Sequence, residues 1–220
     1  WCRCCQGSSG CQGCCAGCQG ARQEVILLVG LGNPGPQYAQ TRHNVGFMAV
    51  DAFCAPKSAA ERVVSFRPKF EGQFAELERA GTRVGVLKPE TFMNASGRSV
   101  RAAASFFGLE PAAVLVVHDE LDVPFGELRL KSGGGDGGHR GLRSISTELA
   151  NPNYGRIRVG IGRPPAHFQG DVADFVLQAF ALEERSELTR VLVSTCEAIE
   201  AVITEGLDRT MNRTNQRTLR

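Results

Sequence analysis

Hydrophobic and polar positions along this chain predict strands and helices in turn from about residue 24 onward. The apolar runs over 25–29 and 114–117 are continuous, as in strands that are buried on both faces. Residues 57–71 are polar and predict irregular structure. Shorter segments predict further strands over 73–78, 83–87, 127–130 and 156–161.

Apolar residues at helical spacing predict four helices among these strands. The first runs from about His43 to Cys54, where Pro56 stops it. The others are expected to end near Gly108, to span 138–149, and to span 188–202. This order predicts one α/β domain over 24–212, with a twisted mixed β-sheet flanked by helices on both faces. A basic tail, 213–220, would follow it.

Cysteine is concentrated at the start of the chain. All of the nine cysteines except Cys54 and Cys196 lie within residues 2–18, among Gly, Gln and Ser. Two C-x-x-C pairs there could suggest zinc, but no strands that would hold a zinc ribbon can be recognised. We expect 1–23 to be a disordered or spurious extension, with a metal site or a transit peptide as alternatives. Cys54 and Cys196 fall in helical apolar patterns and are expected to be buried, which suits a reducing cytoplasm.

Composition narrows the class of protein. The chain has 220 residues, enough for one sizeable core, and 42% of them are hydrophobic. No apolar run approaches the length that crosses a membrane. The net charge is only +2, so a polyanionic partner must be held by a local patch. Basic side chains outnumber acids over 128–170, and the last twelve residues carry four arginines and no acid.

Three separated segments carry the candidate chemistry, each beside turn residues at the edge of an apolar run. The first is Gly-Leu-Gly-Asn-Pro-Gly-Pro-Gln-Tyr (30–38), which continues to Thr-Arg-His-Asn (41–44). The second is Lys-Pro-Glu-Thr-Phe-Met-Asn (88–94). The third is His-Asp-Glu-Leu-Asp (118–122), followed by a glycine run that ends in His139. Scaffolds usually place chemistry at such positions.

Each of these residues has a purely structural interpretation when it is taken alone. Asn33 could form an Asx turn before Pro34, and Asn94 could cap a helix. His43 and His139 could be helix-start residues, and Asp119 a solvated loop acid. Gly-x-Gly-x-x-Gly at 30–35 matches a dinucleotide-binding fingerprint, but the helix is expected to begin too late to face a pyrophosphate, and the expected acid is missing.

In combination the residues fit a hydrolase that has no nucleophilic side chain. Such an enzyme needs a base to activate water, and a carboxylate to orient that base. It also needs carboxamides or backbone N–H groups to hold the carbonyl and its developing oxyanion. His43, Asp119, Asn33 and Asn94 are the right residue types. No Gly-x-Ser-x-Gly elbow is present, and no spacing in the body of the chain suggests a metal site.

The three segments together resemble bacterial-type peptidyl-tRNA hydrolase, in order, from about Val25 to Asn212. The resemblance implies a carboxylic ester hydrolase that cleaves peptide, or an N-blocked amino acid, from the 3′ end of tRNA after premature release. It also implies a single α/β domain that is usually monomeric and needs no cofactor. A cytoplasmic location is expected from the cysteine pattern of the body of the chain.

The resemblance also implies residue roles. His43 would be the general base, Asp119 would orient and stabilise it, and Asn33 would help to distinguish blocked from free aminoacyl-tRNA. Five further side chains would contact the substrate end, and two basic residues would hold the tRNA 5′ phosphate. The substrate-contacting side chains are Tyr38, Phe92, Asn94, His139 and Arg140, and the basic pair is Lys131 and Arg158.

One departure from the family pattern concerns Arg140. The family usually has Asn after the second histidine, where it contacts substrate and helps to place the catalytic water. Arginine cannot accept a hydrogen bond, although it can contact phosphate. The alternative hypotheses are a non-catalytic RNA-binding relative of the organellar splicing-factor type and, more distantly, a nucleotide-binding oxidoreductase. Retention of His43, Asp119, Asn33 and Asn94 favours the enzyme.

Overall fold

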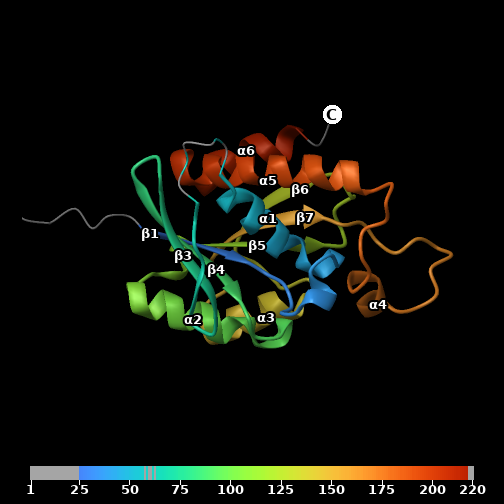
Figure 1. Ribbon diagram of the computed structural model, residues 1–220, viewed down its shortest axis with the longest axis horizontal. Helices are drawn as coiled ribbons and strands as arrows, with labels where there is room; N and C mark the ends of the chain where they lie inside the picture. Colours follow the sequence, from blue (N-terminus) through green and yellow to red (C-terminus); the bar gives the residue numbers. More distant parts are fainter. Residues whose placement is uncertain (1–24, 57, 59–60, 62, 218–220) are drawn as a thin grey trace, which may run out of the picture.

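A seven-stranded mixed sheet forms the centre of the fold (Figure 1). The computed structural model describes residues 25–56, 58, 61 and 63–217, so the expectation for 1–23 lies outside the described residues. The strands are β1 (Val25–Gly30), β2 (Arg67–Lys69), β3 (Gly72–Arg79), β4 (Thr82–Pro89), β5 (Val114–Glu120), β6 (Leu128–Ser132) and β7 (Gly155–Gly160). Their order is β2-β3-β4-β1-β5-β7-β6. The four central strands β4, β1, β5 and β7 are parallel, and β2, β3 and β6 join antiparallel at the edges.

Helices cover both faces of this sheet, as the sequence predicted. The α-helices are α1 (Val45–Cys54), α2 (Ser96–Phe107), α3 (Arg140–Glu148), α4 (Val172–Val176), α5 (Arg185–Glu205) and α6 (Leu207–Arg217). Short 3₁₀ turns are η1 (Pro36–Tyr38), η2 (Arg42–Asn44), η3 (Met93–Ala95) and η4 (Pro111–Ala113). Figure 1 shows α1, α5 and α6 on one face and α2 and α3 on the other. No helix in the described part of the chain is long and apolar enough to cross a membrane.

The apolar pattern of the central strands follows from burial on both faces. Leu115 and Val117 of β5 pack in the core layer under α1 and α5. Val114 and Val116, the alternate residues, pack in the layer under α2 and α3. Successive side chains of a strand point to opposite faces, so a continuous apolar run is needed where both faces are covered. Cys54 is buried, as expected, and its burial raises the pKa of its thiol to about 12. Cys196 is only partly buried.

Three elements were not predicted from the sequence. The edge strand β2 lies within the segment that was expected to be irregular, and α4 and α6 were both missed. The start of α4 carries a capping box in which the side chains of Asp171 and Asp174 each accept a backbone N–H of the other residue. Asn215 of α6 pairs with the backbone N–H and C=O of Leu130 on the free edge of β6, at 2.9 Å each. The boundary expected at 212 therefore falls inside a helix that covers a sheet edge.

Glycines bring the start of α1 against the carboxyl ends of β1 and β5. A side chain at Gly46 would overlap the carbonyl of Val117, and one at Gly30 would lie 2.5 Å from the Gly46 carbonyl oxygen. A side chain at Gly32 would meet the ring of Phe47 at 2.7 Å. These glycines therefore serve close packing of helix on strand. Because η1 and η2 separate the glycine loop from α1, the loop lacks the geometry of a dinucleotide-binding fingerprint.

Candidate active site

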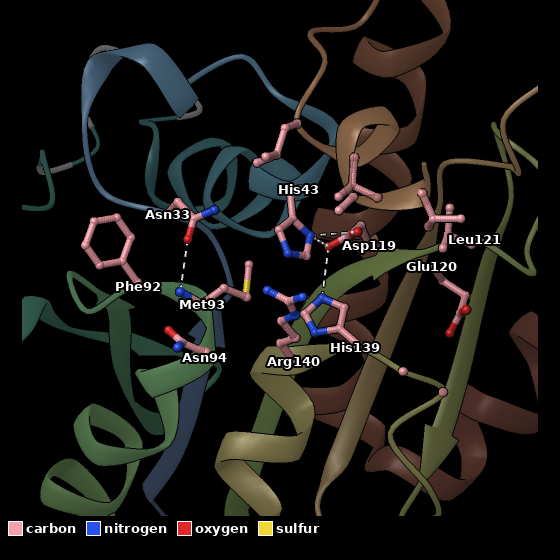
Figure 2. Close-up of a pocket in the computed structure, with 16 residues that line it drawn as sticks. Asn33, His43, Phe92, Met93, Asn94, Asp119, Glu120, Leu121, His139 and Arg140 are labelled. Atoms are coloured by element: carbon pink, nitrogen blue, oxygen red, sulfur yellow. Dashed lines mark hydrogen bonds and ion pairs between the residues drawn. The ribbon is translucent and has the colours of Figure 1, made fainter. Parts of the chain in front are cut away.

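The three motif segments converge on one pocket beyond the carboxyl ends of the parallel strands, where ligands of such sheets bind (Figure 2). The cavity has a volume of about 600 Å³. Tyr38 is half-buried in η1 and does not line the cavity, so its contact with substrate stays a prediction. The predicted site residues that do line it are Asn33, His43, Phe92, Asn94, Asp119, His139 and Arg140.

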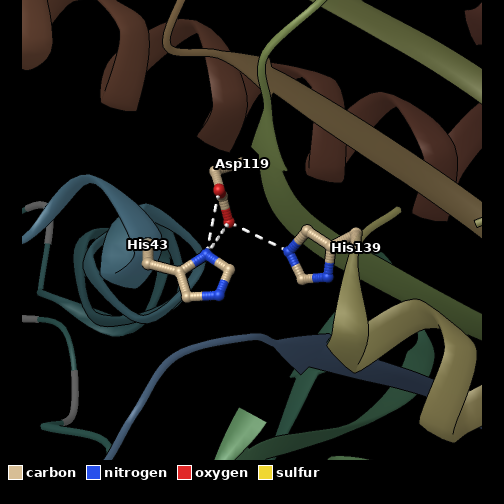
Figure 3. A group of neighbouring side chains, drawn as sticks. All are labelled: His43, Asp119 and His139. Carbon is tan, nitrogen blue, oxygen red and sulfur yellow. Dashed lines mark hydrogen bonds and ion pairs between the residues drawn. The ribbon is translucent and has the colours of Figure 1, made fainter. Parts of the chain in front are cut away.

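Asp119 lies near the end of β5 and joins two imidazoles (Figure 3). Its carboxylate oxygens are each 2.9 Å from Nδ1 of His43, and one of them is 3.0 Å from Nε2 of His139. The Asp119 side chain is only 3% exposed. Burial alone would raise its pKa, but the neighbouring imidazoles outweigh burial and hold the pKa of Asp119 well below its usual range. The group is therefore a carboxylate that accepts hydrogen bonds from both rings.

His43 keeps one nitrogen free for chemistry. Because Asp119 can only accept, the Nδ1 of His43 carries the proton and its Nε2 carries the lone pair. This Nε2 has no hydrogen-bond partner within the described part of the chain, and it points away from Asp119 into the pocket (Figures 2 and 3). A lone pair that is held on an oriented ring is what a general base for water requires.

His139 uses both of its ring nitrogens. Its Nε2–H donates to Asp119, and its Nδ1 accepts from the backbone N–H groups of Gly141 and Leu142 at 3.1 and 3.4 Å. The imidazole is therefore the N-cap of α3. Its tautomer is fixed from both sides, which leaves no lone pair for activating water.

The tautomer of His139, with its proton on Nε2, disfavours metal binding at this group of side chains. His43, Asp119 and His139 offer ligand atoms within 4.8 Å of one another. Coordination through Nε2 of His139 would move its proton to Nδ1, which would break the cap of α3. Metal binding through this nitrogen would therefore cost the N-cap of α3.

Asn33 is clamped so that only its amide donors face the pocket. Its backbone N–H donates to Oδ1 of Asn44 at 2.8 Å, and its C=O accepts from Nδ2 of Asn44 at 2.9 Å. Its own Oδ1 accepts the backbone N–H of Met93 at 2.9 Å, which ties the first motif to the second (Figure 2). The Nδ2 group is left to meet a substrate acceptor. Asn44 belongs to the first motif segment, but its role as a clamp was not predicted from the sequence.

Arg42 anchors the turn that carries His43. Its side chain is buried, donates twice to the carboxylate of Glu184, and lies 4.7 Å from the ring centre of Phe175 and 5.1 Å from that of Phe180. These contacts connect η2 to α4 and to the start of α5. An arginine beside a histidine gave no sequence signal for this role.

The side of the pocket formed by α4 is apolar. Val172 and Leu177 are 45% and 43% exposed, and both line the cavity. This wall was not predicted from the sequence, although the capping box at the start of α4 was a usable signal. The apolar residues along it are Leu121, Val172, Ala173, Val176 and Leu177.

The predicted phosphate residues line a second, smaller cavity of about 190 Å³, which shares Glu120 and Gly137 with the first. Arg158 donates to Glu120 at 2.8 Å. Lys131 has no ion-pair partner within the described residues and is exposed. Arg156, which was missed as a site residue, is buried and donates to the carbonyls of the glycine run that leads to His139.

His118 lines the second cavity and contacts His139, which lines the first. It is 1% exposed, and its Nδ1–H donates to the backbone carbonyl of Asp119 at 2.7 Å. Its ring meets that of His139 edge to face, with centroids 5.0 Å apart. Burial, followed by the nearby His139, lowers the pKa of His118 to about 3. A neutral ring therefore supports the backbone at the end of β5.

A buried carboxylate that orients an imidazole at the carboxyl ends of parallel strands is typical of an α/β hydrolase. The family model for peptidyl-tRNA hydrolase matches residues 27–220. The chain is 49% identical over 193 residues to a peptidyl-tRNA hydrolase of Sorangium cellulosum, covering 88% of this chain and 85% of that one. It is 52% identical over 187 residues to one of Frankia alni, covering 85% and 92%.

Solved structures agree with this match. The crystal structure of peptidyl-tRNA hydrolase from Acinetobacter baumannii superposes with a TM-score of 0.77 at 36% identity, over 88% of this chain and 95% of that one. The chain belongs to the peptidyl-tRNA hydrolase family. The resemblance recognised from the three motifs is thereby confirmed.

Proposed function

We propose that this protein hydrolyses the ester between a peptide, or an N-blocked amino acid, and tRNA, and so recycles tRNA from prematurely released peptidyl-tRNA. The family and its named relatives support the reaction. The observation that carries the mechanism is the free Nε2 of His43, held on a buried carboxylate at the wall of the pocket. A cytoplasmic monomer that needs no cofactor completes the proposal.

In the proposed mechanism His43 removes a proton from water at Nε2. The resulting hydroxide attacks the ester carbonyl, and Asp119 stabilises the imidazolium that forms. The proton then passes to the ribose oxygen as the ester C–O bond breaks, which releases the acid and tRNA. Side-chain N–H groups of Asn33 and Asn94 are in the pocket to hold the carbonyl oxygen as negative charge develops.

Selectivity for a blocked amino group follows from the orientation of Asn33. Its Oδ1 is occupied by the Met93 N–H, so the side chain offers only donors to the substrate. An N-blocked residue presents an amide carbonyl that can accept such a bond. A free aminoacyl group presents an ammonium, which also only donates and would leave the Asn33 donors unpaired.

The tRNA is proposed to lie along the polar and basic side of the site. Phe92 is 63% exposed, and it and Tyr38 could stack on a base or ribose. Lys131 and Arg158 would hold the 5′ phosphate at the second cavity. In this proposal His139 contacts the substrate, and its hydrogen bond holds the Asp119 carboxylate in place.

The experiment compares N-acetylated with unblocked aminoacyl-tRNA as substrates, in the presence of a chelator. We expect rapid release of the acetylated aminoacyl group and slow release of the free one. Tight tRNA binding without cleavage would contradict the proposal and favour the non-catalytic RNA-binding relative. Cleavage that stops on chelation would contradict the metal-free mechanism.

A further inference from the structure

Arg140 is an unpaired cation inside the catalytic pocket. It is the first residue of α3, and its guanidinium extends between Met93 and His139 toward the cavity (Figure 2). It makes no hydrogen bond or ion pair with any described residue. Arg143, one turn later on the same helix, is instead paired with Asp136 at 3.2 Å. The guanidinium of Arg140 is therefore available to a ligand.

The surroundings of Arg140 resemble a nucleotide-binding wall. The start of α3 packs directly on η3, since a side chain at Gly141 would lie 2.6 Å from the sulfur of Met93. This contact places Arg140 on the same side of the pocket as the exposed ring of Phe92 and the carboxamide of Asn94 (Figure 2). Proteins that bind single-stranded nucleic acid combine an aromatic stacking surface with a cation for the backbone phosphate.

The opposite wall suits the acyl part of the substrate. It consists of Leu121 and the aliphatic residues of α4, and the carboxylate of Glu120 beside it is already paired with Arg158. None of the described residues along this wall offers an unpaired cation to an acidic side chain of a peptide. The anion that fits Arg140 therefore belongs to the nucleotide rather than to the peptide.

We propose that Arg140 binds the last phosphodiester of the tRNA, the one that precedes the 3′-terminal nucleotide, while that nucleotide stacks near Phe92. The inference rests on the proposed function. It assigns a second phosphate contact in the catalytic pocket, separate from the cavity of Lys131 and Arg158. A guanidinium suits this contact because its planar donors match phosphate oxygens.

The test is a four-way kinetic comparison. Wild type and Arg140→Gln are assayed on a short RNA with the tRNA 3′ sequence and an N-acetylaminoacyl ester, carrying either a normal phosphodiester or a neutral methylphosphonate at the last linkage. We expect Arg140→Gln to raise KM about tenfold on the phosphodiester, the size of one charge-assisted hydrogen bond. On the methylphosphonate, wild type and variant should have the same KM.

Arg143→Gln is the matched control, because it removes an equal charge from the same helix outside the catalytic pocket. It should leave both KM values unchanged, and Arg140→Lys should restore part of the difference between substrates. Equal effects of Arg140→Gln on both substrates, no effect on either, or an effect confined to acidic acyl groups would each overturn the inference. Failure of the wild type to cleave either ester would instead overturn the proposed function.

Discussion

The catalytic pocket and the neighbouring basic cavity share Glu120 and Gly137, yet they are built differently. Around Asp119 the polar side chains form hydrogen bonds with one another. The Nε2 atom of His43 is left without a partner among the described residues. The basic cavity is instead lined by charged side chains. Arg158 forms an ion pair with Glu120, and Lys131 is exposed.

The difference indicates a division of work between neighbouring regions. A fully hydrogen-bonded cluster fixes geometry and protonation, which chemistry requires. An exposed cation attracts phosphate over a distance, is weakened by salt, and needs little fixed geometry. Substitutions around Asp119 should therefore change kcat, whereas substitutions in the basic cavity should change tRNA affinity.

Asp119→Asn tests the catalytic side with the largest of the expected effects among these variants. Asparagine can accept from one imidazole but presents an N–H group to the other, so the tautomers of His43 and His139 can no longer both be fixed. We expect kcat to fall about 10⁴-fold, as for loss of the orienting carboxylate in comparable sites. Single-turnover cleavage and tRNA binding should be measured together, and a matching loss of affinity would contradict the division.

His139→Ala tests whether His139 stabilises the fold as the N-cap of α3. It removes the cap of α3 and a hydrogen bond to the Asp119 carboxylate, so we expect a loss of about 2 kcal/mol in unfolding free energy. His139→Asn keeps a capping side chain and should recover about 1 kcal/mol of it. Denaturant unfolding measures both variants. Equal stabilities for the two would show that the ring does not cap the helix.

His118 predicts a pH-dependent loss of stability. Its pKa is about 3 in the folded protein against 6.5 unperturbed, so its contribution is full above pH 6.5 and is lost as pH falls toward 3. The expected slope is about 1.4 kcal/mol per pH unit between these values. His118→Asn keeps an N–H for the Asp119 carbonyl and should flatten the curve over this range, as read from urea unfolding. If the unfolding free energy of His118→Asn kept the wild-type slope against pH, a group other than His118 would cause the pH dependence.

Lys131→Ala tests the basic cavity, where the smallest effect is expected. One exposed phosphate contact should weaken tRNA binding severalfold and reduce the slope of log affinity against log salt by about 1, with kcat unchanged. Arg158→Ala should change the slope less, because Glu120 already compensates its charge. Arg101→Ala, an ion-paired exposed arginine on α2, is the control. A slope for Lys131→Ala equal to wild type would remove Lys131 from the phosphate site.

Most of the fold could be predicted because its central strands and long helices have strong local patterns. Val114–Val117 and the apolar face of α5 each indicate their element without tertiary information. The short α4 and the polar α6 could not be recognised in this way. Asn215 is informative only once the free edge of β6 beside it is known.

The residue types of the site could be predicted from local sequence, whereas the division of roles between the two histidines came only from the family resemblance. His43 and His139 are both histidines at helix starts, and nothing in the sequence shows which one retains a lone pair. The distinction depends on Gly141 and Leu142, whose N–H groups occupy Nδ1 of His139. Buried supports such as Arg42 and Asn44 were likewise invisible, because their partners lie far away in the chain or on the backbone.

The most direct test of the account is His43→Ala, assayed for tRNA affinity and for single-turnover cleavage of N-acetyl-aminoacyl-tRNA. Removal of the general base should reduce the cleavage rate by about 10³-fold, within the range for acid–base groups. The Kd for tRNA should stay close to that of the wild type, because the basic cavity is untouched. Cleavage at a near wild-type rate would contradict the assignment of the base, and loss of binding in parallel with cleavage would contradict the separation of chemistry from affinity.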